Sequence, residues 1–403
     1  MGHETQGGMH APIEGEQESL VSALEGLVSN TAQHSSSDKL GSSAHNGPYT
    51  PAPTSKNEHK SWWSKLASVE GLAQSRLDDL FAEHHLGNWI AIRGTNEKIF
   101  ESMPIAVRLG MHLLFFGSKA TSLLRYNSVE DVLESMSARQ GRIYDDASDP
   151  EAVLQHVKNF IETYSINLSE LAEPDPTKYR TMNDFFYRKL KSDARPIADA
   201  DNSRIISSAA DCRIAVFDNV ESATKVWIKG KRFSLAHLVG DANLADRCFP
   251  PGSALAIFRL APADYHRYHH PVGPATVGPI RHEKGEYYTV NPQAVNQNFD
   301  VFTANRRDVL LLDWKPSGAQ SYTVAFVAIG ALLVGSIGWS AATQGSAVTR
   351  GEEAGWFAYG GSTIVAIFPP EAKIKFDQDL VHNSQNALET MVRVGDRIGI
   401  SEA

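Results

Sequence analysis

One stretch of this chain constrains the rest more than any other: Trp356–Phe368, with the sequence WFAYGGSTIVAIF. Two glycines and a Ser-Thr pair separate an aromatic approach from an apolar run typical of a buried strand. The glycines permit unusual backbone conformations and leave the carbonyl of Gly361 uncrowded. If the turn holds the hydroxyl of Ser362 against that carbonyl, the serine can attack its own peptide bond. The alternative interpretation is a glycine turn into a buried strand, without chemistry.

Composition narrows the class of protein. The chain has 403 residues, a formal net charge of −9 and no basic block, which argues against nucleic acid as a partner. Its two cysteines, Cys212 and Cys248, are too few for a disulfide framework or a cysteine-based zinc cluster. We therefore expect reduced thiols and an intracellular protein, either cytoplasmic or peripheral on an endomembrane.

The N-terminal part divides into a leader and a helical region. Residues 1–60 are rich in Ser, Gly, His, Asn and Pro and predict a disordered leader without a secretory signal. Residues 61–196 predict helices. Within them, Met103–Gly117 is strongly apolar but shorter than the roughly 18 residues that a membrane span needs. This segment predicts either a core helix or a helix at a membrane surface, which would give peripheral membrane contact.

The other helices expected in this region follow apolar spacing near 3.6 residues. Thr181 is the expected N-cap of the last helix, with Asp184 in its first turn. The expected helical segments are Trp62–Phe100, Leu123–Gly141, Glu151–Tyr164 and Tyr179–Leu190.

After Pro196 the pattern changes to short apolar runs separated by Gly, Pro, Asn and Asp. Helices followed by a mainly β body, residues 197–403, predict an α+β fold that contains the Gly-Gly-Ser-Thr turn. The expected strands are Arg204–Ser207, Arg213–Phe217, Ala223–Ile228, Ala254–Leu260, Thr276–Ile280, Tyr287–Val290, Val309–Leu312 and Thr323–Leu333.

Two further polar features of the β body could support chemistry. Asp211 stands at a turn before a strand, where a turn-capping aspartate is the ordinary interpretation. Asp264–Pro271 carries histidines at 266, 269 and 270, for which a metal site is the obvious rival interpretation. Asp, His and Ser in this chain order could form a catalytic triad. Ser362, however, lacks the Gly-x-Ser-x-Gly context of an ordinary hydrolase.

These three features, in this order, resemble the phosphatidylserine decarboxylase family. The family's self-processing turn is matched by Gly360–Thr363, its Asp-Tyr-His-Arg-aromatic-His motif by Asp264–His269, and its aspartate turn by Ser208–Asp211. Ala209 stands where the family usually has proline. The resemblance extends from about Phe100 to the C-terminus and is specific as a joint pattern.

The resemblance implies that the precursor cuts itself between Gly361 and Ser362, giving chains that end at 361 and start at 362. Attack by Ser362 Oγ on the Gly361 carbonyl would give an ester, and elimination followed by loss of ammonia would leave a pyruvoyl group derived from Ser362. His269, oriented by Asp211, would be the base. His266 would protonate the carbanion left when CO2 departs. His270 is expected to have no role.

The implied activity is decarboxylation of phosphatidylserine to phosphatidylethanolamine at a membrane surface, by a covalent pyruvoyl group with neither pyridoxal phosphate nor a metal. Two alternatives remain open. One is a pyruvoyl enzyme whose substrate is a soluble amine-bearing carboxylate, such as an aromatic amino acid. The other is a non-enzymatic lipid-binding relative. Family members often pair, so a homodimer is expected.

Overall fold

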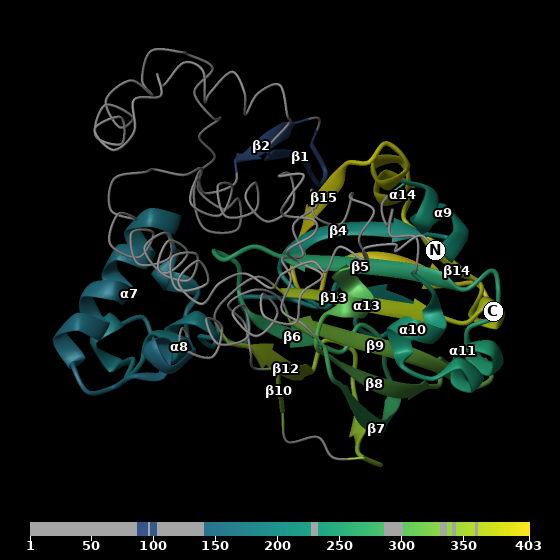
Figure 1. Cartoon of the computed structure of the whole chain (residues 1–403). Coiled ribbons are helices and arrows are strands. Elements are labelled where there is room, and N and C mark those ends of the chain that lie inside the picture. Colours follow the sequence, from purple (N-terminus) through teal and green to yellow (C-terminus); the bar gives the residue numbers. More distant parts are fainter. Residues whose placement is uncertain are drawn as a thin grey trace, which may run out of the picture.

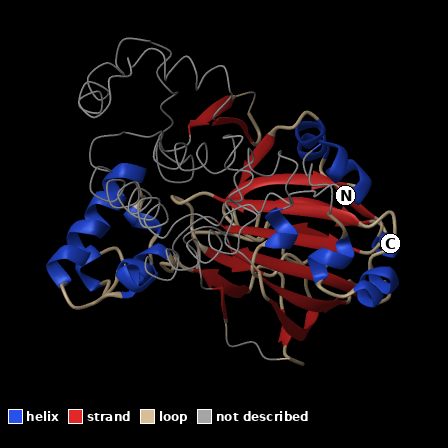
Figure 2. Cartoon of the chain, viewed as in Figure 1, coloured by secondary structure: helices blue, strands red, loops and turns tan. Residues whose placement is uncertain are grey.

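The computed structural model describes residues 87–95, 97–102, 141–226, 233–285, 301–330, 337–340, 344–358 and 362–403. The leader predicted for residues 1–60 and the apolar segment Met103–Gly117 lie outside this part of the chain. The described residues form the α+β arrangement expected from the sequence (Figures 1 and 2).

A ten-stranded sheet forms the centre of the structure, in the order β11-β7-β8-β9-β13-β5-β4-β15-β1-β2. Its neighbouring strands are antiparallel, except that β1 runs parallel to β15. The strands are β1 (Gly87–Ile92), β2 (Lys98–Ser102), β4 (Cys212–Phe217), β5 (Ala254–Leu260), β7 (Ala275–Glu283), β8 (Arg307–Trp314), β9 (Tyr322–Gly330), β11 (Ala347–Val348), β13 (Ser362–Phe368) and β15 (Glu389–Val392).

Two three-stranded sheets and a helix cover one face of this sheet. The small sheets have the orders β10-β12-β6 and β14-β16-β3. Their elements are β3 (Ile205–Ser207), β6 (Arg267–His269), β10 (Ile337–Trp339), β12 (Glu353–Phe357), β14 (Ile374–Phe376) and β16 (Arg397–Ser401), with α14 (Gln378–Gln385) beside them. Together they enclose the larger apolar core, which includes Tyr268, Phe357 and Phe376.

Short helices cover the opposite face (Figure 2). They are α9 (Val220–Val226), α10 (Leu235–Val239), α11 (Ala242–Cys248) and α13 (Val301–Ala304). Side chains of Ser234 and Asp241 cap the N-termini of α10 and α11, and Gly240 ends α10 in a left-handed conformation. These polar caps favour the helical conformation of α10 and α11 despite their short length.

A helical unit stands apart from the sheet, at the left of Figure 1. It contains α7 (Pro150–Tyr164), capped by Asp149, and α8 (Met182–Phe186), with the short helices η1 (Leu168–Glu170) and η2 (Pro176–Lys178). Another short helix, η3 (Pro370–Ala372), follows β13. Phe160, Phe185 and Phe186 pack together in the unit's own core.

Many of the predicted elements are confirmed. The helix predicted over Glu151–Tyr164 is α7, and Thr181 caps α8 by accepting from the amide of Asp184. The strand Ala254–Leu260 has the predicted ends. Five of the other predicted strands overlap β3, β4, β7, β8 and β9, whereas Tyr287–Val290 falls among residues that are not described.

Two predictions were wrong. Part of the predicted helix Trp62–Phe100 is the hairpin β1–β2, in which Trp89 is exposed and Ile90 is buried. The segment is extended because β1 pairs with β2 on one side and with the distant β15 on the other. The predicted strand Ala223–Ile228 begins instead inside helix α9. Asn219 accepts a hydrogen bond from the amide of Ser222 and thereby favours the helical turn.

Gly355 in β12 provides a test of this architecture. A Cβ at this position would lie 2.6 Å from the hydroxyl oxygen of Tyr268 and closer still to the carbonyl oxygen of Gly338. We expect Gly355→Ala to lower the free energy of unfolding by about 1–3 kcal/mol, because the clash separates β10 from β12. Urea denaturation measures the change. The matched control is Gly141→Ala, where the new Cβ has no atom within 4 Å and no loss is expected.

Candidate active site

Ser362 is the first residue of β13 and lies in the middle of the large sheet. It is opposite Leu260 at the end of β5 and Gly330 at the end of β9. Its side chain is fully buried, and among the described residues its hydroxyl has no hydrogen-bond partner. A buried hydroxyl without a partner costs free energy and therefore calls for an explanation, of which a catalytic role is one. Gly361, on the other side of the predicted cleavage site, is not among the described residues.

The loop after β5 carries the first histidine of the motif. Asp264 is fully buried, forms an ion pair with Arg213 of β4, and accepts a hydrogen bond from the amide of Ala261 at 2.7 Å. The main chain of His266 is held by the amide of Phe357, which donates to its carbonyl at 2.9 Å. Because Leu260 pairs with Ser362, this loop leaves β5 at the sheet end where β13 begins.

The ring of His266 is buried and oriented by two contacts. Its Nδ1 lies 3.0 Å from the carbonyl oxygen of Asp264, and its ring centroid lies 3.9 Å from that of Phe186 in α8. Burial lowers the pKa of His266 to about 4, although the charge of Asp264 acts in the opposite direction. Since a carbonyl only accepts, Nδ1 carries the proton and Nε2 presents a buried lone pair without a partner.

His269 is the last residue of strand β6. Its Nδ1 lies 2.9 Å from the carbonyl oxygen of Gly351, and its Nε2 lies 3.2 Å from the hydroxyl of Tyr265. Its amide donates to the carbonyl of Ala209 at 2.8 Å, in the predicted aspartate turn. Burial lowers the pKa of His269. The hydrogen bond to Gly351 and the charges of Glu353 and Asp211 act in the opposite direction and raise it.

Asp211 is fully buried and bound to an arginine. Its two carboxylate oxygens each lie 3.0 Å from Nε of Arg195, and Oδ2 lies 2.6 Å from Nη2 of the same side chain. The amide of Val394 donates to Oδ1 at 2.9 Å. Arg195 also binds Glu170 at 2.8 Å. Asp211 therefore influences His269 through its charge, while the ring nitrogens of His269 bond to Gly351 and Tyr265.

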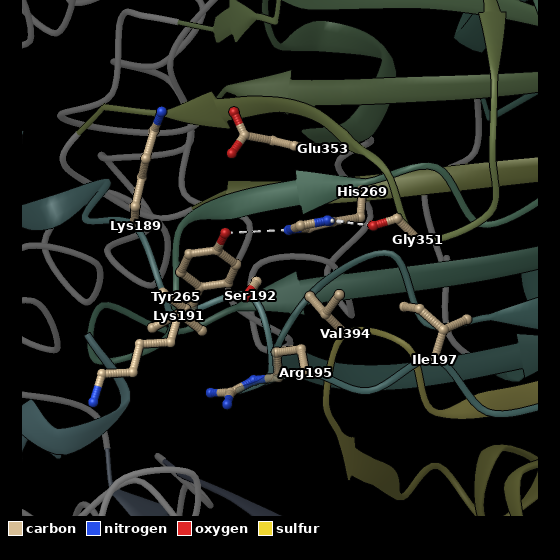
Figure 3. A pocket seen from close by; sticks show the side chains of 11 residues that line it. Lys189, Lys191, Ser192, Arg195, Ile197, Tyr265, His269, Gly351, Glu353 and Val394 are labelled. Atoms are coloured by element: carbon tan, nitrogen blue, oxygen red, sulfur yellow. Dashed lines mark hydrogen bonds between the residues drawn. The ribbon is translucent and has the colours of Figure 1, made fainter. Parts of the chain in front are cut away.

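A cavity of about 240 Å³ opens beside His269 (Figure 3). Tyr265 and His269 form one part of its wall, and Arg195 and Val394, both partners of Asp211, form another. The remaining lining residues are Lys189, Leu190, Lys191, Ser192, Ile197, Gly351 and Glu353. His269 lines this cavity directly, whereas Asp211 lies behind its wall and is bound to the lining residues Arg195 and Val394. Ser362 and His266 do not line this cavity.

His270 is buried, and neither of its ring nitrogens has a hydrogen-bond partner. Its main chain binds Glu352 and Gly351 through hydrogen bonds of 2.9 Å each. Burial lowers the pKa of His270 to about 4, although the negative charge of Glu352 acts to raise it. Within the described residues, no three His, Cys, Asp or Glu side chains are placed to hold a metal ion. The histidines at 266, 269 and 270 do not form such a cluster.

Sequence reasoning gave no role to several residues that shape this site. Arg188 is buried, its pKa is lowered to about 10 by burial, and its Nη2 donates to the carbonyls of Ala263 and Asp264. Arg195 stands directly before Pro196, at the end of the predicted helical region. No local pattern reveals these contacts, because each joins the helical unit to a distant part of the β body.

Comparisons with known proteins identify the family of this chain. The family model for phosphatidylserine decarboxylase matches residues 182–400. The chain belongs to the phosphatidylserine decarboxylase family. The matched region begins at α8 and includes Asp211, His266, His269 and Ser362. This confirms the resemblance drawn from the motifs.

Three decarboxylase relatives illustrate the match. The phosphatidylserine decarboxylase proenzyme 3 of Schizosaccharomyces pombe is 38% identical over 338 residues, which cover 84% of this chain and 33% of the relative. The proenzyme 2 of Oryza sativa subsp. japonica is 41% identical over 313 residues, or 77% of this chain and 48% of the relative. The proenzyme of Chlamydia trachomatis is 42% identical over 243 residues, or 60% of this chain and 77% of the relative.

The chain therefore spans a third to a half of the length of its yeast and rice relatives. It covers most of the chlamydial relative. The three sequence motifs all lie within residues 182–400, which match the family model.

His270 gives a prediction about acid stability. Its pKa of about 4 lies below the ordinary value of 6.5, so the unfolded chain binds an extra proton as the pH falls below 6.5. The stability of the folded protein therefore falls between pH 6.5 and pH 4. We expect His270→Met to reduce the loss between pH 7 and pH 5 by about 2 kcal/mol. Urea denaturation at both pH values measures it. The control is His156→Met at an exposed position of α7; an equal effect there would contradict the explanation.

Proposed function

We propose that this chain is a pyruvoyl-dependent decarboxylase that converts phosphatidylserine to phosphatidylethanolamine and CO2 after cutting itself between Gly361 and Ser362. The observation that carries the proposal is the buried hydroxyl of Ser362 at the start of a central strand, which has no hydrogen-bond partner in the described part of the chain. The names of the relatives support it, because each is called a phosphatidylserine decarboxylase proenzyme.

The surroundings of Ser362 fit a nucleophile that becomes part of a cofactor. A hydroxyl without a partner loses no hydrogen bond when it attacks a carbonyl. The pyruvoyl group that this serine would yield supplies an electron sink for the electrons released when CO2 leaves. Its position would be fixed, because β13 is paired with β5 and with β9.

His269 is the proposed base of self-processing. With Nδ1 bound to the carbonyl of Gly351, its basic lone pair is at Nε2. Its lowered pKa keeps the ring neutral at physiological pH, which a base requires. Asp211 has the supporting role of a buried negative charge that stabilises the protonated ring, and Arg195 fixes that carboxylate.

His266 is the proposed proton donor in decarboxylation, in which a proton takes the place of the carboxylate. Its Nε2 is buried and without a partner, and Phe186 and Asp264 fix the ring. With a pKa of about 4 the ring is neutral at rest. Because Nε2 carries no proton at rest, it must first take one from solvent, and an imidazolium of low pKa then passes that proton readily to the carbanion.

Membrane contact, pairing and location belong to the same proposal. No helix in the described ranges is long and apolar enough to cross a membrane. We propose peripheral contact with an intracellular membrane, through the apolar segment Met103–Gly117, because the substrate is a membrane lipid. The homodimer suggested by the family resemblance is likewise a proposal.

Cleavage of the chain provides one test of the proposed function. We expect the purified protein to consist of two chains, with a new end at residue 362, whereas Ser362→Ala stays in one piece because it lacks the attacking oxygen. Intact mass spectrometry measures both. The control is Thr363→Val, which removes the neighbouring buried hydroxyl, also without a partner, and should still be cut. A full-length wild-type chain would overturn the proposal.

The identity of the substrate provides another test of the proposed function. We expect CO2 release from vesicles of phosphatidylserine in phosphatidylcholine, and none from free serine, tyrosine or tryptophan. Ser362→Ala is the background control, since it cannot form the pyruvoyl group. Release from a free aromatic amino acid alone would favour the soluble-substrate alternative. Vesicle binding without CO2 release would favour the lipid-binding alternative.

A further inference from the structure

Tyr265 is the residue that contacts the basic nitrogen of His269. Its hydroxyl oxygen lies 3.2 Å from Nε2, and Figure 3 shows the two side chains directed at one another beside the cavity. The ring centroids are 5.7 Å apart with an interplanar angle of 39°, so the contact is made by the hydroxyl and not by stacking.

The partners of the ring determine the direction of this hydrogen bond. The carbonyl of Gly351 can only accept, so Nδ1 of His269 carries the ring proton and donates it. In the neutral ring Nε2 is then an acceptor, and the hydroxyl of Tyr265 must be the donor. Burial raises the pKa of Tyr265, which keeps the phenol protonated and able to donate.

Main-chain contacts hold both side chains in place. The amide of His269 is fixed on the carbonyl of Ala209, and the carbonyl of His266 is fixed by the amide of Phe357. Tyr265 is only 5% exposed and stands directly before His266. The phenol and the imidazole are therefore parts of one rigid turn and strand, four residues apart.

We propose that Tyr265 is a positioning residue for self-processing. The hydroxyl of Tyr265 is hydrogen-bonded to Nε2 of His269, and the carbonyl of Gly351 to Nδ1. These two hydrogen bonds select the tautomer whose lone pair is at Nε2, and they fix the plane of the ring. When Nε2 takes up a proton, the same hydroxyl can turn and accept, because a phenol is both donor and acceptor. The proposal rests on the function proposed above, in which His269 is the base.

Removal of this hydroxyl tests the proposal against a matched variant. Tyr268 lies in the same short strand region, is fully buried, and donates to the carbonyl of Gly338 at 2.8 Å. Tyr265→Phe and Tyr268→Phe each remove one buried hydrogen bond, but only the first reaches His269. We expect Tyr265→Phe to slow the appearance of the two chains at least about tenfold, since the base is no longer held in one orientation. Tyr268→Phe should be cut within about twofold of the wild-type rate.

A spectroscopic measurement separates this role from a general structural one. In a Ser362→Ala background, which should keep the chain uncut, nitrogen NMR on labelled histidine reports the state of each ring nitrogen. The resonance of Nε2 of His269, assigned by its loss in His269→Gln, should move downfield in Tyr265→Phe, as for a lone pair released from a donor. It should stay in place in Tyr268→Phe.

The outcomes distinguish the two proposals. If the wild-type chain is cut and Tyr265→Phe is cut equally fast, the role of Tyr265 is wrong while the proposed function stands. If the wild-type chain is never cut, the proposed function fails, yet the spectra still test the contact. An unchanged Nε2 resonance in Tyr265→Phe would overturn the inference in either case.

Discussion

The site depends on the pairing of β13 along both of its edges. Ser362–Phe368 is in register with all of β5 on one side, and Ser362–Ile367 is in register with β9 on the other. Alternate side chains of the strand enter the two apolar cores, with Ile364 in one and Val365 in the other. The strand cannot slip by one residue without exchanging these faces. The position of the Ser362 hydroxyl is therefore set by the core and not by the glycine turn alone.

Charges buried at the end of this sheet hold the histidine motif. Arg213 on β4 binds Asp264, and Arg195 from the segment after α8 binds Asp211. Loss of one partner would leave an unpaired buried charge, which costs several kcal/mol, so each pair tolerates little movement. The pair Arg213–Asp264 connects β4 to the turn that carries His266. The pair Arg195–Asp211 connects the segment after α8 to the carboxylate whose charge acts on His269.

Sequence patterns correctly predicted the elements whose formation depends on neighbouring residues in the chain. Apolar runs bounded by turn residues located β5, and a threonine before an apolar turn located the cap of α8. The β1–β2 hairpin was missed because its partner β15 lies some 300 residues further along the chain (Ile90 pairs with Glu389). The triad residues came from motif resemblance. The contacts of Tyr265 and Arg195 require the folded chain, since no spacing in the sequence shows that a phenol faces an imidazole or that an arginine binds Asp211.

The place of β13 in the sheet order also dictates a sequence of events. A cut before Ser362 would leave the segment 362–403 held by β13 between β5 and β9, by β15 between β4 and β1, and by the bond from Val394 to Asp211. Neither fragment could form these ladders alone, because each would present open edges at the middle of a sheet. Cleavage at this bond would therefore have to follow folding, and the two pieces would stay together in one folded body until denaturation separated them.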